Sequence, residues 1–152
     1  MPYTVGIENS TKKKIQIYAM CSLLIMGLTL GRAQADLPEI QSRSNLSCMM
    51  GGIGVDETEA MRIEAKKWPL NVEFTEQQGK AYPWISGAQL QIINQTGRVI
   101  FNETCNGPLF LAKLNPGKYQ LIATYEGVAK KKSVLIEEGK PAKVSFTWVK
   151  KG

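Results

Sequence analysis

Hydrophobic and polar residues alternate along the second half of the chain. Leu70, Val72 and Phe74 alternate with polar residues, and the same period of two returns over 119–125 and 142–148. This period is typical of β-strands that place one face on a core and the other in solvent. The pattern therefore predicts a mainly β protein.

Turn-forming sequences rich in Asn, Gly and Pro separate the alternating segments. About seven short strands at a spacing of roughly 8–12 residues favour a β-sandwich over a parallel α/β sheet. We therefore expect a seven-stranded antiparallel β-sandwich. The expected strands lie near residues 70–76, 86–93, 98–104, 108–114, 118–125, 128–136 and 142–149.

One short N-terminal α-helix is expected before the first of these strands. Asp56 has the residue type of an N-cap, and Glu59, three positions on, completes the pattern of a capping box. Met61, Ala65 and Trp68 fall on one face at helical spacing, and a proline follows directly. Together the helix and strands form an expected domain over 55–149.

The first 35 residues have the order of a secretory signal peptide. Three lysines at 12–14 precede the apolar run 15–30, and Ala33 and Ala35 provide the small residues of a cleavage site. Cleavage between Ala35 and Asp36 is expected. The alternative is a membrane anchor, but an apolar run of about 24 Å is shorter than a hydrocarbon core of roughly 30 Å.

Removal of this segment changes the composition on which a functional interpretation rests. The whole chain has 152 residues and a formal charge of +6, whereas residues 36–152 have 15 basic and 12 acidic residues and a charge of +3. A nucleic-acid-binding protein is expected to be more basic. We expect a periplasmic or secreted protein, no nucleic-acid partner and no stable membrane span after cleavage, with residues 36–54 forming a flexible leader.

Two cysteines remain after cleavage, because Cys21 leaves with the signal peptide. In an oxidising compartment Cys48 and Cys105 are candidates for a disulfide, which would close a loop of about 58 residues and add roughly 4 kcal/mol to stability. Two unpaired thiols are the alternative.

The chain contains no histidine. Ser-His-Asp and Cys-His nucleophilic sites and histidine-ligated zinc are thereby excluded. The sequence also has neither a C-x-x-C pair nor an acidic calcium loop. We therefore expect no catalytic residue, no metal and no cofactor.

A family resemblance covers about residues 84–148. Leu114-Asn115-Pro116-Gly117-Lys118-Tyr119, preceded by Gly107-Pro108-Leu109-Phe110-Leu111 and followed by Tyr125-Glu126-Gly127, resembles a carboxypeptidase regulatory-like domain. These domains belong to the transthyretin-like, or prealbumin-like, group of seven-stranded sandwiches. The resemblance implies a non-catalytic accessory or binding fold in a small secreted bacterial protein, and it carries no catalytic residues to this chain.

Aromatic residues are the candidate binding residues. Tyr82 and Trp84 share a predicted loop, and Trp68 ends the helix; such side chains stack on sugars and anchor protein interfaces. The alternative is that Trp84 and Trp68 simply pack against the sandwich. We expect a non-enzymatic binding or accessory module of the cell envelope, whose partner is an envelope protein or a glycan. A carbohydrate-binding protein that uses the loop aromatics is the second hypothesis.

Overall fold

The computed structural model describes residues 36–43 and 45–150. The predicted signal peptide, including Ala35 at its cleavage site, lies outside these residues, and Asp36 is exposed in a coil. Of the helices in the described ranges, none is long and apolar enough to cross a membrane.

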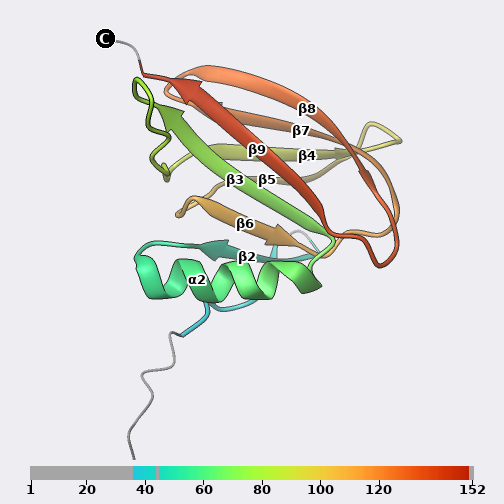
Figure 1. Ribbon diagram of the computed structural model, residues 1–152. Helices are drawn as coiled ribbons and strands as arrows, with labels where there is room; N and C mark the ends of the chain where they lie inside the picture. Colours follow the sequence, from blue (N-terminus) through green and yellow to red (C-terminus); the bar gives the residue numbers. More distant parts are fainter. Residues whose placement is uncertain (1–35, 44, 151–152) are drawn as a thin grey trace, which may run out of the picture. The chain divides into compact units, whose positions relative to one another are not determined.

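Two β-sheets and one short helix make up the described chain (Figure 1). The first sheet has five strands in the order β1 (Gln41–Arg43), β2 (Leu46–Gly51), β6 (Leu109–Ala112), β3 (Leu70–Gln77) and β9 (Ala142–Val149). The second has four strands in the order β5 (Val99–Thr104), β4 (Gln89–Asn94), β7 (Gly117–Tyr125) and β8 (Val128–Ile136).

The mainly β prediction is confirmed, whereas the count of seven strands is too low. Strands β3 to β9 lie where the alternation and the turn-forming sequences together place them, and β1 and β2 precede them. The strand pairs are antiparallel apart from β3 and β9, which run parallel with Leu70 opposite Ala142. Alternation reports which face a residue occupies but not which strand pairs with it.

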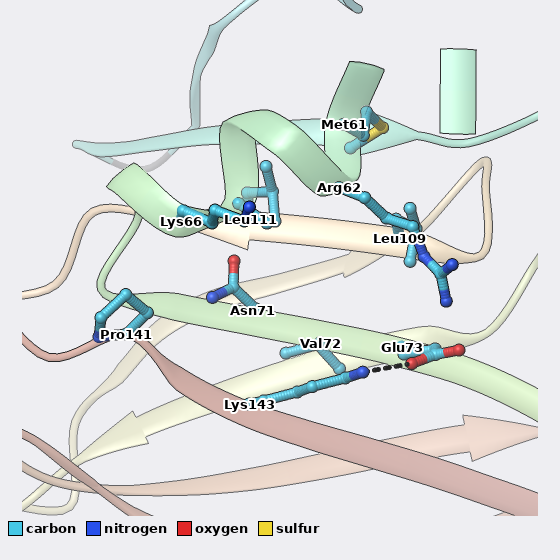
Figure 2. A pocket seen from close by; sticks show the side chains of 11 residues that line it. Met61, Arg62, Lys66, Asn71, Val72, Glu73, Leu109, Leu111, Pro141 and Lys143 are labelled. Carbon is cyan, nitrogen blue, oxygen red and sulfur yellow. Dashed lines mark ion pairs between the residues drawn. The ribbon is translucent and has the colours of Figure 1, made fainter. Parts of the chain in front are cut away.

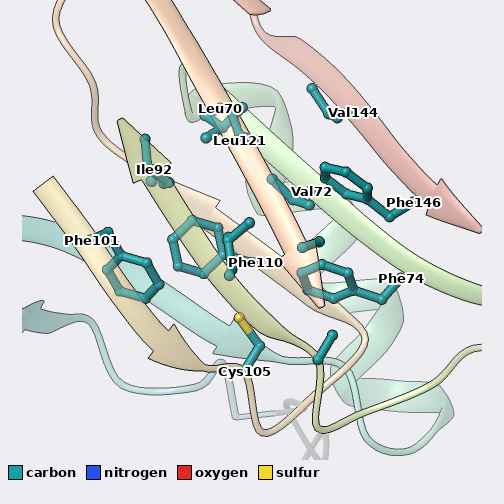
Figure 3. Close-up of a cluster of buried hydrophobic side chains, with 14 of the residues drawn as sticks. Leu70, Val72, Phe74, Ile92, Phe101, Cys105, Phe110, Leu121, Val144 and Phe146 are labelled. Atoms are coloured by element: carbon teal, nitrogen blue, oxygen red, sulfur yellow. The ribbon is translucent and has the colours of Figure 1, made fainter. Parts of the chain in front are cut away.

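The main hydrophobic core lies between the two sheets and takes side chains from both (Figure 3). Phe110 of β6 and Phe101 of β5 meet there with ring centroids 4.9 Å apart. On the same core, Phe74 and Phe146 stack across the parallel pair at 6.2 Å. The sheets thus face each other in a sandwich-like arrangement, with apolar residues inward.

The expected flexible leader is wrong for residues 41–43 and 46–51, because these form β1 and β2. Leu46, Cys48 and Met50 are buried in the core between the sheets, and Met49 is buried on the opposite face under the helix. Covered on both faces, β2 pairs with β6 from Cys48 to Gly51. Burial on both faces removes the clear polar alternation that would have identified the strand.

The helix α2 (Val55–Glu64) continues into the 3₁₀ turn η1 (Ala65–Lys67) before β3 begins. Its beginning differs from the expected capping box: Gly54 is the N-cap, and the Glu57 carboxylate accepts the Gly52 N–H at 2.6 Å. Met61 and Trp68 pack with Leu109 and Leu111 on the outer face of the five-stranded sheet. The helix therefore covers β2 and β6, beside the outer face of β3.

Candidate functional site

A groove of about 310 Å³ lies between the helix and the outer face of β6, β3 and β9 (Figure 2). We call it the helix–sheet groove. Its apolar lining includes Met61, Leu109 and Leu111. Its polar lining comprises Arg62, Lys66, Asn71, Glu73 and Lys143. Such a combination of an apolar lining with a few convergent polar groups is typical of small-molecule sites.

Trp84 lies beside this groove, fixed by two of its lining residues. Its backbone forms an isolated antiparallel bridge with Thr75 of β3. The indole Nε1 donates a hydrogen bond of 2.6 Å to Glu73 Oε1, and the Arg62 guanidinium carbon lies 5.2 Å from the ring centroid. Trp84 stays 38% exposed. A partly exposed indole is thus held in a defined orientation between a cation and a carboxylate.

The groove carries more positive than negative charge. Glu73 is the one carboxylate among its lining residues, and Lys143 Nζ lies 3.3 Å from Glu73 Oε2. Across the described residues, neither Arg62 nor Lys66 has a carboxylate within 4 Å. Two cations at the groove therefore remain without an ion-pair partner in this part of the chain.

Asn71 presents a buried polar atom without a partner. It lies on β3 opposite Lys143, and its Nδ2 donates to the Trp68 carbonyl at 3.4 Å. Its Oδ1 is buried and accepts no hydrogen bond within the described structure. Figure 2 shows this oxygen pointing from the sheet toward the helix. An unsatisfied buried acceptor costs roughly 1–3 kcal/mol and marks a position for a hydrogen-bond donor.

The three predicted aromatic residues do not share one surface. Trp68 is 2% exposed and packs under the helix, where its Nε1 donates to Glu64 at 3.3 Å. Because the ring of Trp68 is buried, no ligand can stack on it. Its surroundings agree with the alternative stated above, in which Trp68 packs against the sandwich. Tyr82 is 57% exposed on the loop, and of the two exposed aromatic residues Trp84 contacts Arg62 and Glu73 of the groove.

The sequence reasoning missed the polar residues that line the helix–sheet groove. Arg62 lies on the helix, Asn71 and Glu73 on β3 and Lys143 on β9. In the sequence, each of these residues has the type and position expected of an ordinary solvent-facing residue. The period of two did place Asn71 and Glu73 on the same outward face of their strand, which was the available signal.

Both predicted disulfide partners are buried, and in the structure both are free thiols. They belong to the same core cluster. Burial raises the pKa of both thiols, and in Cys105 the nearby Cys48 adds to this rise. The bond is thus not formed in the structure, and the disulfide of an oxidised protein stays a prediction. Mass measurement of the non-reduced protein tests it: two alkylatable thiols after unfolding would exclude the bond.

Within the described ranges no group of three or more His, Cys, Asp or Glu side chains is placed to hold a metal ion.

Comparison with protein-family models finds no match for the chain, and comparison with curated proteins finds none either.

Proposed function

We propose that the protein is a non-enzymatic binding module of the bacterial cell envelope, periplasmic or secreted, and that it binds its partner at the helix–sheet groove. The observation that carries this proposal is the fixed position of Trp84, between Glu73 and Arg62, at the edge of an apolar cavity. Trp and Arg, the two residue types that meet here, are enriched among the anchor residues of binding surfaces.

The proposed fold relationship is to transthyretin-like, carboxypeptidase regulatory-like domains. The resemblance rests on the sequence over 84–148, which spans β4 to β9. In this proposal β3 to β9 form the seven-stranded unit, and β1, β2 and the helix are an N-terminal addition. The absence of histidine from the whole sequence supports a binding role over the common hydrolytic mechanisms.

A carbohydrate-binding protein is the second candidate. Tyr82 and Trp84 are both exposed on the loop between β3 and β4, as aromatic residues that stack on sugar rings must be. Against this role, the Arg62 guanidinium lies over the Trp84 ring. A sugar would have to use the opposite face of the indole, or Tyr82 alone.

Co-sedimentation with bacterial cell envelopes tests the proposal. Saturable binding is expected, and Trp84→Ala should weaken it at least fivefold, while Lys118→Gln on the exposed surface of β7 should leave it unchanged. Circular dichroism checks that each variant is folded. Absence of saturable binding, or equal binding by Trp84→Ala, contradicts the proposal.

Titration with peptidoglycan fragments and other glycans, followed by tryptophan fluorescence, separates the two candidates. A spectral shift that Tyr82→Ala abolishes supports the carbohydrate-binding role. No shift at saturating glycan, together with envelope binding that depends on Trp84, supports a protein partner.

A further inference from the structure

We infer that the helix–sheet groove binds an N-acylated amino acid with an apolar side chain and a free carboxylate, either as a free molecule or as the last residue of a peptide. This assignment rests on the proposed function and names the chemistry of the ligand. Three features of the groove each account for one part of such a ligand: its charge, its buried acceptor and its apolar lining.

The charge of the groove calls for an anion. Lys143 is already paired with Glu73, which leaves Arg62 and Lys66 without a carboxylate in the described structure. Both residues are on one side of the groove, in α2 and η1. A guanidinium binds a carboxylate through charge-assisted hydrogen bonds that are stronger than neutral ones. An uncharged ligand would form no ion pair with Arg62 or Lys66.

The unpartnered Asn71 Oδ1 calls for a hydrogen-bond donor on the same ligand. Asn71 extends from β3 on the side of the groove opposite the helix (Figure 2). Its Nδ2 donates to the Trp68 carbonyl at 3.4 Å, and its buried Oδ1 points from β3 toward the helix (Figure 2). An amide N–H supplies the missing donor. Sulfate, or an unsubstituted fatty acid in its ionised form, has no hydrogen-bond donor.

The apolar part of the lining calls for a hydrocarbon side chain. Met61, Leu109 and Leu111 line the cavity, and all three belong to the cluster that joins the helix to the sheet. The volume of about 310 Å³ is near the lower end of the range of small-molecule pockets, about 300–1,000 Å³. It therefore suits a single amino-acid residue better than a long chain.

Isothermal titration calorimetry with the purified protein tests the assignment, using N-acetylleucine, N-acetylleucinamide and an N-acetylated pentapeptide that ends in leucine. The acid is expected to bind at least tenfold more tightly than the amide, because the amide removes the charge that Arg62 and Lys66 bind. Added salt should weaken the acid more than the amide.

Single substitutions of the groove residues test which side chain binds which part of the ligand. Arg62→Gln and Lys66→Gln should each weaken the acid at least fivefold and leave the weak affinity of the amide unchanged. Asn71→Leu should weaken the acid and the amide alike, because both contain the N–H that it binds. Lys118→Gln removes the same charge on the other sheet and should have no effect.

Equal affinities for the acid and the amide, or no heat with either, would overturn the assignment, as would wild-type affinity in Asn71→Leu. Tight binding of the pentapeptide identifies a chain end as the source, whereas binding of N-acetylleucine alone identifies a free molecule; both outcomes support the shared chemistry. If the protein binds envelopes through Trp84 but neither acid, only the ligand assignment fails. If envelope binding is also absent, the proposed function fails with it.

Discussion

Replacement of Leu46 by alanine tests whether β2 is part of the core. Leu46 opens β2 and is 6% exposed in the core between the sheets. The substitution removes three buried carbon groups, worth about 0.8 kcal/mol each, or about 2.4 kcal/mol in total. Leu46 also lines a surface hollow beside Asn45 and Tyr119, so water can fill part of the space and the additional cavity cost is small. We expect a loss of about 2–3 kcal/mol in the free energy of unfolding.

Urea unfolding, followed by circular dichroism, measures this loss. With a slope of about 2 kcal/mol per molar urea, the unfolding midpoint should fall by about 1–1.5 M. Ile40→Ala is the matched control, because Ile40 lies in the same N-terminal segment but is 55% exposed. Its midpoint should change by less than about 0.3 M.

The two variants separate a core strand from a loose tether. If Leu46→Ala unfolds at the same urea concentration as Ile40→Ala, residues 46–51 do not belong to the cooperative unit, and the placement of β2 beside β6 is refuted. A lower slope without a lower midpoint would instead report a change in the compactness of the unfolded chain.

Three further predictions follow from hydrogen bonds and buried thiols. Trp148→Phe keeps an aromatic ring but removes the 2.8 Å bond from the indole to the Val128 carbonyl, and should cost about 1–2 kcal/mol in urea unfolding; an unchanged midpoint would show that water replaces this bond without cost. Thr58→Val removes the hydroxyl that donates to the carbonyls of Gly52 and Gly54 at 2.8 and 2.6 Å, and should also cost about 1–2 kcal/mol in the free energy of unfolding. An unfolding midpoint equal to that of the wild type would contradict the role of these bonds. In the reduced protein, burial raises the pKa of the Cys105 thiol above its usual value of 9.0. The folded protein therefore holds this proton more tightly than the unfolded chain, whose thiol titrates near pH 9. The resulting contribution to the free energy of unfolding is complete below about pH 9 and falls as the pH rises further. Unfolding from pH 7 to 10.5 should therefore show a steeper alkaline loss for wild type than for Cys105→Ala, and parallel profiles would contradict this source of the loss.

Most of the fold could be predicted because most strands bury one face only. The period of two is clear in β3, β4, β7 and β9, turn-forming sequences delimit three more strands, and the structure places all seven at the predicted positions. Strand β2 was missed because Met49 and Met50 are both buried, one under the helix and one between the sheets. The parallel pairing of β3 with β9 could not be predicted from the sequence pattern either, because this pairing depends on contacts between segments about 70 residues apart.

The candidate site could be predicted only in part. Trp84 was found by its residue type, because an aromatic residue in a polar loop is conspicuous. Its partners Arg62 and Glu73 were not, because a charged residue on a helix or on the outer face of a strand is the ordinary case. Only the tertiary structure brings these side chains to the same indole.

The N-terminal segment that the sequence presents as a tether supports the helix that forms one wall of the groove. Met49 of β2 extends the apolar surface of β6, and Met61 of the helix packs on the two together. Without β2 the helix would have only Leu109 and Leu111 of one four-residue strand to pack against. On the next strand the outward residues are Asn71 and Glu73, which favour solvent or a polar ligand over contact with a helix. The helix therefore lies over β2 and β6 and leaves β3 accessible, and the groove forms where the apolar part of the outer face gives way to the polar part. The apolar side chains of Leu109 and Leu111 and the polar side chains of Asn71 and Glu73 in its lining thus follow from the same change in residue type across the sheet.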